Sequence, residues 1–375
     1  MNICLNLQLW RNSIGFMKTV KQTRILEIDP LNPRMDYLLE AAKIIKEGGV
    51  VVFPTETVYG IGADALNSEA VKMIFEAKGR PLDNPLIVHI SDLEQLSIIS
   101  IEVREDVYRL AEKFWPGPLT IILRKSGKIP YEVTAGLETV AVRMPAHPVA
   151  LRLIKLSGTP IAAPSANPSG KPSPTSGEHV KRDMMGKVDL IIDSGETLYG
   201  VESTIIDITR DPPMLLRPGA LPVEDIEKVL GKKITIPRFA RGLVEAYEAI
   251  APGMRYRHYS PSKPLTIIES RDYSNLERYC LHVVNYVKKL KEDGLKVVVL
   301  ASTETLNYYH EVEVICLGSR ENLFEIARNL YKALRRIDEL DVDVAVSEGF
   351  EERSLGLTIM NRLRKASGYN IIIVD

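Results

Sequence analysis

The stretch FEAKGRPLDNPLIVHI, residues 75–90, places Lys78, Arg80, Asn84 and His89 among apolar residues and two prolines. Gly79 and Pro81 break a helix, so we expect the lysine and the arginine on a loop beyond the last helical turn. A rigid guanidinium beside a mobile ammonium group could clamp a polyphosphate. Alternatively, the two cations are solvated charges that a helix C-terminus favours. The histidine, taken alone, is more often a hydrogen-bonded core residue.

A second polar segment, IAAPSANPSGKPSPTSG at residues 161–177, follows a predicted strand. Loops at strand ends are where α/β proteins bind ligands, and Ser165, Asn167 and Ser173 offer hydroxyl and amide groups to a phosphate or a purine. The alternative is a turn-rich connector. Two further segments, AVRMP with Arg143 and GVESTIID with Ser203, place polar residues in or next to strands. A buried arginine usually has an anionic partner.

Three common kinds of site are not supported by the sequence. The Gly60-x-Gly62 pair lacks the third glycine and the acidic residue of a dinucleotide-binding fingerprint, so turn glycines are the simpler interpretation. SGKP lacks the spacing of a phosphate-binding P-loop. The cysteines, which are Cys4, Cys280 and Cys316, are too scattered for a zinc site or a disulfide framework. We therefore expect no protein-bound metal.

The elements that must position these residues alternate irregularly up to residue 230. Helical spacing predicts helices over 36–47, over 68–78 with Ser68 as N-cap, around 103–114 and over 148–156. Apolar runs predict strands at 50–53, 85–90, 119–123, 139–144 and 160–165, and residues 54–67 are predicted as a loop. Because two of these strands follow each other without a helix, the sheet should be mixed rather than purely parallel.

The pattern changes after residue 230. Residues 231–263 are rich in Gly, Pro, Arg and Tyr and are predicted to be a linker. Apolar strands and helical segments then alternate strictly, which predicts a smaller parallel α/β domain over 264–375. The predicted organisation is therefore an N-terminal extension at 1–20, a first domain at 21–230, the linker and the second domain.

The 375 residues exceed the usual size of one core, in agreement with two domains. A formal net charge of −1 argues against a strongly basic nucleic-acid binder, although a local basic patch stays an open alternative. The first 16 residues resemble neither a signal peptide nor a membrane span, and Met17 could be an alternative start. We expect a cytoplasmic protein without membrane attachment.

The pairs Lys78-x-Arg80 and Ser165-x-Asn167, together with FPTETVYGIG, WPGPLT, VAVRMP, VESTI and LLRPG, resemble the YrdC/Sua5 family over residues 36–230. PGMRYRHYSP and GLTIMNRLRKA resemble its long, Sua5-type branch. The resemblance implies an α/β fold in which a YrdC-like twisted mixed sheet encloses a large concave cavity. A smaller C-terminal Rossmann-like parallel α/β (Sua5) domain should follow.

The same resemblance implies synthesis of L-threonylcarbamoyladenylate from L-threonine, bicarbonate and ATP, with release of pyrophosphate. The product would pass to a downstream tRNA threonylcarbamoyltransferase complex that makes the t6A modification at adenosine 37 of tRNA. Mg²⁺ is expected as a cofactor on the triphosphate. Two alternatives stay open, an RNA- or tRNA-binding module without chemistry and carbamoyl transfer to another acceptor.

The resemblance also assigns site residues. The L-threonine site would contain Thr57, His89, Arg143, Ser203 and, through its backbone alone, Ala163. The ATP site would contain Lys78, Arg80, Asn84, Thr139, Ser165, Asn167, Ser173 and Arg217. Lys78 and Arg80 are the expected catalytic cations, because charge that develops on phosphate needs fixed positive groups more than a nucleophile. The carboxylate of threonine suits Arg143.

The segment APGMRYRHYSP, residues 251–261, is too polar for a core strand and too aromatic for an inert tether. An easily hydrolysed carbamate and adenylate would benefit from a cover that excludes water. We therefore predict a lid, with Tyr256 and Tyr259 as nucleotide contacts. The second domain is expected to cover or regulate the site, and a purely stabilising role is the alternative.

Overall fold

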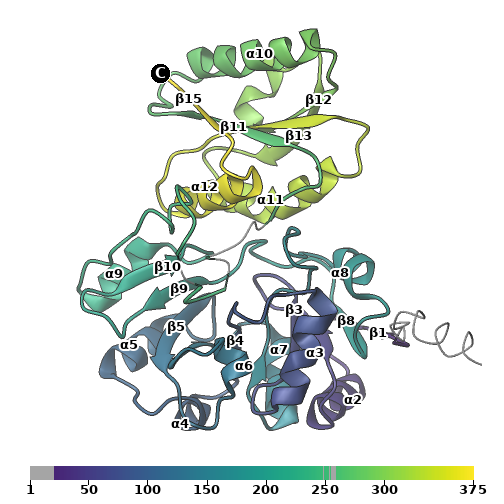
Figure 1. Ribbon diagram of the computed structural model, residues 1–375, viewed down its shortest axis with the longest axis vertical. Coiled ribbons are helices and arrows are strands. Elements are labelled where there is room, and N and C mark those ends of the chain that lie inside the picture. Colours follow the sequence, from purple (N-terminus) through teal and green to yellow (C-terminus); the bar gives the residue numbers. More distant parts are fainter. Residues whose placement is uncertain (1–20, 248, 253, 255–258) are drawn as a thin grey trace, which may run out of the picture.

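The computed structural model describes residues 21–247, 249–252, 254 and 259–375 and contains two sheets that lie in separate layers of the molecule (Figure 1). The N-terminal extension expected at 1–20 and the linker residue Tyr256 lie outside the described residues. Among the residues that are described, no helix is long and apolar enough to cross a lipid bilayer.

The first sheet contains ten strands within the described residues, in the spatial order β1-β8-β2-β3-β7-β4-β6-β5-β9-β10. The strands are β1 (Arg24–Glu27), β2 (Val51–Phe53), β3 (Gly60–Asp64), β4 (Ile87–His89), β5 (Leu119–Arg124), β6 (Thr139–Arg143), β7 (Ile161–Ala162), β8 (Leu190–Asp193), β9 (Thr204–Asp207) and β10 (Met214–Arg217). The pairs β4–β6 and β5–β9 are parallel, whereas β5–β6, β4–β7 and β3–β7 are antiparallel. The expectation of a mixed sheet is confirmed.

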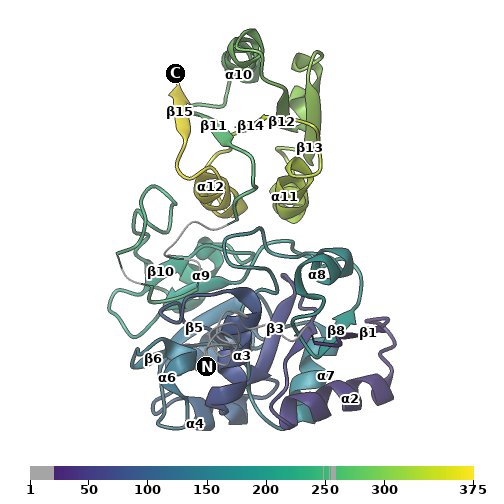
Figure 2. The same cartoon turned by 45° about the vertical axis from the view of Figure 1, so that its right-hand side comes forward.

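Helices surround this sheet and connect its strands (Figures 1 and 2). They are α2 (Met35–Lys46), α3 (Ser68–Lys78), η1 (Leu93–Gln95), α4 (Leu96–Ile99), α5 (Glu105–Phe114), α6 (Tyr131–Thr134), α7 (Pro148–Ser157), α8 (Gly177–Met184) and α9 (Val223–Leu230). The cap expected at Ser68 is wrong by one residue. The side chain of Asn67 accepts hydrogen bonds from the backbone N–H groups of Glu69 and Ala70, and Ser68 is already helical.

One predicted loop is a strand. Residues 54–67 include β3, which pairs with β2 on one side and with β7 on the other. Its glycines are needed for packing rather than for a turn, because a Cβ at Gly62 would lie 2.6 Å from side-chain atoms of both Phe53 and Ile161. Without side chains at these positions, the sequence shows no alternating pattern that would indicate a strand.

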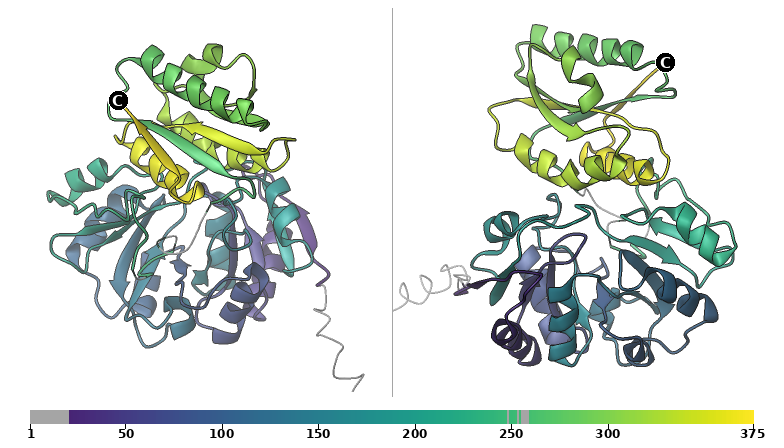
Figure 3. Two further views of the ribbon diagram at one scale, coloured as in Figure 1. Left: turned by 45° about the horizontal axis from the view of Figure 1, so that its top comes forward. Right: turned by 180° about the vertical axis from the view of Figure 1, so that it is seen from behind.

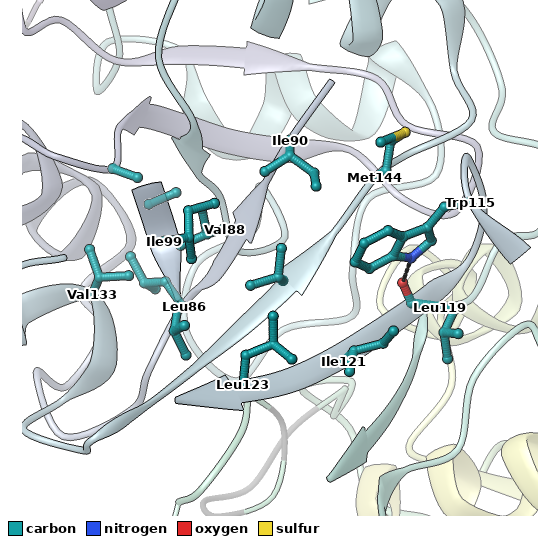
Figure 4. Close-up of a cluster of buried hydrophobic side chains, with 14 of the residues drawn as sticks. Leu86, Val88, Ile90, Ile99, Trp115, Leu119, Ile121, Leu123, Val133 and Met144 are labelled. Carbon is teal, nitrogen blue, oxygen red and sulfur yellow. Dashed lines mark hydrogen bonds between the residues drawn. The ribbon is translucent and has the colours of Figure 1, made fainter. Parts of the chain in front are cut away.

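The core of the first domain packs between the sheet and its helices. Figure 4 shows Val88 of β4, Ile121 and Leu123 of β5 and Trp115 as members of one cluster of buried apolar side chains. The indole Nε1–H of Trp115 is buried and donates to the carbonyl oxygen of Leu119 at 2.7 Å. This satisfied hydrogen bond allows a large aromatic ring in an apolar core.

The second sheet is parallel at each of its pairings and has the order β13-β12-β14-β11-β15. Its elements are β11 (Leu265–Ser270), α10 (Leu276–Glu292), β12 (Val297–Ser302), η2 (Thr303–Tyr308), β13 (Glu313–Gly318), α11 (Leu323–Ile337), β14 (Val344–Glu348), α12 (Leu355–Ala366) and β15 (Ile371–Val374). This confirms the smaller parallel α/β domain. The helices α11 and α12 lie on the face toward the first domain, and α10 covers the opposite face (Figures 2 and 3).

The two domains are joined by buried polar contacts as well as by apolar packing. The guanidinium of Arg335 on α11 pairs with Asp183 on α8, and the hydroxyl of Thr358 on α12 donates to the carbonyl oxygen of Gly219. The amide of Asn361 donates to the carbonyl oxygen of Ala240. Because buried polar groups must keep their partners, these contacts fix how α11 and α12 sit on the first domain.

Candidate active site

An open cavity lies where β4, β6 and β10 end and β3 begins, and Pro252 and Tyr259 of the linker also line it. The predicted site residues that line it are Lys78, Arg80, His89, Arg143, Ala163, Ser165, Asn167, Ser173, Ser203, Arg217 and Tyr259. Among the described residues, Thr57, Asn84 and Thr139 were also predicted but do not line it. The fold therefore gathers segments that are far apart in the sequence around one space.

Lys78 is the last residue of α3, so its expected place beyond the helix is wrong. Gly79, with a φ of 60°, ends the helix after it. The buried Nζ of Lys78 donates to the carbonyl oxygens of Ser165 and Asn167, the latter at 2.5 Å. Burial, reinforced by nearby Arg80, lowers the pKa of this ammonium group. In this structure Lys78 holds the loop that carries Ser165 and Asn167.

Arg80 lies on the loop after α3 and lines the cavity. Its Nε and Nη2 donate to the carbonyl oxygens of Asn84 and Pro85 at 3.1 and 2.9 Å. These bonds fix the guanidinium at the cavity wall. Asn84 itself is buried, and its Oδ1 has no hydrogen-bond partner within the described structure. Of the residues predicted to bind the phosphates of ATP, Arg80 thus lies in the cavity wall and Asn84 lies behind it.

His89 and Arg143 lie side by side, because the register of the parallel pair β4–β6 places them opposite each other. Burial, with the positive charge of Arg143, lowers the pKa of His89 to about 3, so its imidazole is neutral at physiological pH. Its Nδ1 is buried and lacks a partner among the described residues. A neutral imidazole with an unpaired ring nitrogen can form a hydrogen bond to a polar ligand.

Glu56, which was not among the predicted site residues, is the anionic partner of Arg143. Nη2 of Arg143 donates to Oε1 of Glu56 at 2.6 Å, and Nε donates to the carbonyl oxygen of Gly117 at 3.2 Å. Oε2 of Glu56 is buried without a partner in the described part of the chain. The expectation that a buried arginine needs an anion could have led to Glu56, which lies in the PTETVYG segment.

Ser203 and Arg217 form the opposite wall. The hydroxyl groups of Ser203 and Thr120 are 2.7 Å apart, and Nη2 of Arg217 donates to the carbonyl oxygen of Ser203 at 2.9 Å. Nη1 of Arg217 donates to the carbonyl oxygen of Pro252 at 3.3 Å, which connects the first residues of the predicted lid to this wall. Burial lowers the pKa of Arg217, although a guanidinium remains charged.

Ser173, Asn167 and Ala163 differ in what they can offer a ligand. The hydroxyl of Ser173 donates to Oε1 of Glu202 at 2.6 Å. The amide nitrogen of Asn167 donates to two loop carbonyl groups, and its buried Oδ1 has no partner among the described atoms. The backbone N–H of Ala163 donates to the carbonyl oxygen of Ile87, so a backbone contact to threonine would have to use the Ala163 carbonyl oxygen.

Tyr259 is buried in the cavity wall and stacks on Tyr331 of α11 with 5.2 Å between ring centroids. At the other end of the predicted lid, Ala251, Pro252 and Met254 are also buried. The described ends of the predicted lid therefore pack against protein. Within the described residues, no group of three or more His, Cys, Asp or Glu side chains could hold a metal ion.

Comparisons with known proteins agree with this architecture. Residues 43–219 match the family model Sua5_yciO_yrdC, described as Telomere recombination, and residues 221–368 match Sua5_C, described as Threonylcarbamoyl-AMP synthase, C-terminal domain. The threonylcarbamoyl-AMP synthase of Pyrococcus abyssi is 55% identical over 89% of this chain and 95% of its own length. That of Bacillus subtilis is 47% identical over 92% of this chain and 96% of its own.

A crystal structure of P. abyssi Sua5 complexed with L-threonine has a TM-score of 0.88 and 52% sequence identity to this chain. The match covers 94% of this chain and 100% of the P. abyssi chain. The fold inferred from sequence motifs, with its mixed first sheet and parallel second sheet, is thereby confirmed. The chain therefore belongs to the Sua5 family, in which a Sua5/YciO/YrdC domain precedes a Sua5 C-terminal domain.

Proposed function

We propose that this chain is a threonylcarbamoyl-AMP synthase, which joins L-threonine, bicarbonate or carbon dioxide, and ATP, and releases pyrophosphate. One observation carries the proposal. A single cavity brings a buried arginine and a neutral histidine close to the cations Arg80 and Arg217. The names of the relatives and the threonine complex of the P. abyssi protein support the same reaction.

L-threonine is proposed to bind beside Arg143. The guanidinium has a fixed orientation from Glu56 and Gly117, so it is ready to receive a carboxylate. The neutral ring of His89 and the hydroxyl of Ser203 can form hydrogen bonds to the β-hydroxyl group without adding charge. Nδ1 of His89, which has no partner among the described residues, is available for such a bond. A role of Thr57, which lies behind Thr55 of the wall, stays a prediction.

ATP is proposed to bind along Arg80, Arg217 and the loop of Ser165 and Asn167. Arg80 and Arg217 carry permanent charges that backbone carbonyl groups hold in place, so the cavity would need little rearrangement to stabilise charge on phosphate. Lys78 contributes by holding that loop through two carbonyl groups. The predicted ATP contacts of Asn84 and Thr139 stay predictions.

The chemistry requires two bond-forming steps. The neutral amine of threonine attacks the carbon of carbon dioxide, or of bicarbonate with loss of water, and loses a proton to give a carbamate. A carbamate oxygen then attacks the α-phosphorus of ATP, and the bond from that phosphorus to the bridging oxygen of the β-phosphate breaks. Pyrophosphate leaves with the bonding electron pair. Fixed cations at the wall stabilise the charge that moves to the phosphate oxygens.

ATP is proposed to enter as its magnesium complex. The donor set fits this view, because the described residues contain no metal-ligand cluster and the phosphates supply the oxygen ligands that Mg²⁺ prefers. The ion would supply charge neutralisation on the triphosphate. The protein's own task is then to orient the α-phosphate toward the carbamate.

The reaction is tested by pyrophosphate release from the full chain with ATP, bicarbonate and threonine, each omitted in turn. We expect release to depend on all three and the product to have the mass of threonylcarbamoyl-AMP. Release that is equal with and without threonine would contradict the proposal.

We further propose that the product feeds t6A synthesis through a tRNA threonylcarbamoyltransferase complex. Labelled threonine should enter unmodified tRNA only when this chain and such a complex are both present. If the chain instead acts only by binding RNA, it should bind tRNA tightly. The transferase complex should then incorporate threonine equally well without the product that this chain makes from ATP.

A further inference from the structure

A carboxylate in the wall of a cavity that is proposed to hold ATP requires explanation. Glu202 lines the cavity, is only 6% exposed and lies next to Ser203. A negative charge here would repel a triphosphate unless the protein neutralises it, and an unpaired buried carboxylate is costly in itself.

The partners of Glu202 come from both domains. Oε1 accepts a hydrogen bond from the hydroxyl of Ser173 at 2.6 Å, within the first domain. Oε2 accepts from the hydroxyl of Tyr331 on α11 at 2.7 Å and from Nε of Arg362 on α12 at 3.0 Å. Both oxygens of this carboxylate are therefore held, one by each domain.

Arg362 is built into this position. Its side chain is fully buried, and Nη2 donates to the carbonyl oxygen of Pro218 at 2.8 Å while Nη1 donates to Oδ1 of Asn361 at 2.6 Å. Its guanidinium also lies 5.0 Å from the ring centroid of Tyr259, the tyrosine of the predicted lid. One arginine of the second domain thus contacts Glu202, the backbone of the first domain and the linker.

The charge balance around Glu202 depends on this arginine. Burial alone would raise the pKa of Glu202, but Arg362 first and then Arg217 outweigh burial and lower the pKa to about 2. The other titratable groups that face it are Tyr259, Tyr331 and Lys365. Burial and the two arginines lower the pKa of Lys365 to about 7, so Arg362 is the permanent cation in direct contact.

We propose that Arg362 and Tyr331 are positioning residues for the ATP side of the cavity: they neutralise and orient Glu202, which in turn holds the hydroxyl of Ser173. The second domain therefore supports the cavity wall from behind, through its contacts with Glu202, rather than acting as a detachable cover. This inference rests on the proposed function, because it assumes that an anionic nucleotide occupies the cavity.

The test uses the full chain and measures KM for ATP, KM for threonine and kcat by pyrophosphate release. In Arg362→Gln, Glu202 remains buried with one cation fewer, so we expect KM for ATP to rise tenfold or more while KM for threonine changes less than threefold. Arg182→Gln is the matched control, since its pair with Glu339 also joins the domains at 2.6 Å but lies on the surface. The control should behave as wild type.

A pH profile and a double variant separate this role from a general loss of structure. Without Arg362, burial should raise the pKa of Glu202, so protonation should partly restore ATP affinity in Arg362→Gln as the pH falls from 8 to 5.5. Glu202→Gln combined with Arg362→Gln should recover at least threefold in KM for ATP over Arg362→Gln alone. If Arg362→Gln does not fold, Tyr331→Phe replaces it in the test, because this variant loses only one hydroxyl group. We then expect KM for ATP to rise threefold or more in Tyr331→Phe.

The inference is overturned if Arg362→Gln matches Arg182→Gln. It is equally overturned if the rise in KM for ATP in Arg362→Gln is independent of pH and unchanged by Glu202→Gln. If Arg362→Gln does not fold, a Tyr331→Phe variant that matches wild type overturns it. A wild-type chain whose pyrophosphate release ignores threonine would overturn the proposed function instead, so the two failures are distinguishable.

Discussion

At the scale of single residues, the cavity separates charged groups that are held rigidly from neutral groups that remain unpaired. Arg80, Arg143 and Arg217 each donate to backbone carbonyl groups. Nδ1 of His89 and Oδ1 of Asn167 have no partner within the described structure. Fixed cations suit the charged ends of substrates, and unpaired neutral atoms suit hydroxyl or amide groups of a ligand.

Two of the three arginines in the wall, Arg80 and Arg143, should bind different substrates. Arg80→Ala should weaken ATP binding, since a lost charged hydrogen bond to phosphate costs roughly 1.5 to 3 kcal/mol, while threonine binding remains measurable. Arg143→Ala should lose threonine first. Isothermal calorimetry with each ligand checks this, with the exposed Arg124→Ala as the control. If Arg80→Ala leaves the affinity for ATP unchanged, Arg80 has a structural role and does not bind the phosphates.

His89 should make stability depend on pH. Its pKa falls from 6.5 to about 3 on folding, so as the pH drops through this window the unfolded chain binds a proton that the folded chain does not. The free energy of unfolding should therefore decrease toward acid, by at most about 1.4 kcal/mol per pH unit for one such group. Urea unfolding of His89→Gln should show a shallower acid slope.

His147 and His179, whose pKa values burial lowers to about 4, remain in both proteins of this comparison and contribute equally. The difference between the two slopes therefore reports His89 alone. Identical slopes would mean that His89 is already protonated, or accessible to water, in the folded protein.

At the scale of elements, most of the apolar runs were predicted as strands, whereas β1, β3 and β8 were not. The strand over 119–124 and the strands of the second domain show their apolar character directly, whereas β3 contains glycines where a strand would show side chains. β1 and β8 are short, and they pair with each other across more than 160 positions of sequence, so local patterning did not indicate them.

Sequence patterns predicted the site residues better than they predicted the contacts between them. The signature pairs predicted the residues of the two loops, but the pairing of Glu56 with Arg143 spans 87 residues and depends on the strand order. Lys78 was identified as important, yet its role in holding the Ser165 loop follows from its buried place at the end of α3. Contacts across the sheet decide such roles, and a sequence pattern does not report them.

Gly62 should not tolerate a methyl group. Its Cβ would lie 2.6 Å from atoms of both Phe53 and Ile161, so Gly62→Ala must displace two neighbouring strands and should cost about 1 to 3 kcal/mol of unfolding free energy. Gly127→Ala provides the control, because a methyl group there would meet no surrounding atom within 4 Å. Denaturant titration compares the two variants. Equal stabilities would show that β3 adjusts without cost.

At the scale of the whole molecule, the linker lies between the domains and both of its described ends are buried. Ala251 and Met254 pack with Ile87, Ile122 and Leu216 of the first domain, and Tyr259 packs with residues of the second. An opening of the predicted lid would require Ala251, Met254 and Tyr259 to leave these contacts. The lid hypothesis makes this opening the route by which substrates enter.

Limited proteolysis tests the lid. Threonine together with ATP should slow cleavage within 251–261 severalfold, because nucleotide contacts would hold Tyr259 in the wall and reduce the population of the open state. Cleavage at an unrelated exposed loop should keep its rate and serves as the internal control. If ligands leave both rates unchanged, the linker is a tether and the cavity closes by other means.

The partnership of Glu202 and Arg362 also has a consequence for the order in which the chain is made. The two residues are separated by 160 positions, and a ribosome that adds 5 to 20 residues per second needs roughly 10 to 30 seconds to cover that distance. During this interval a nascent first domain contains Glu202 while its partner arginine does not yet exist. The surroundings of this carboxylate in the nascent first domain therefore remain incomplete until Arg362 has been synthesised and α12 has docked.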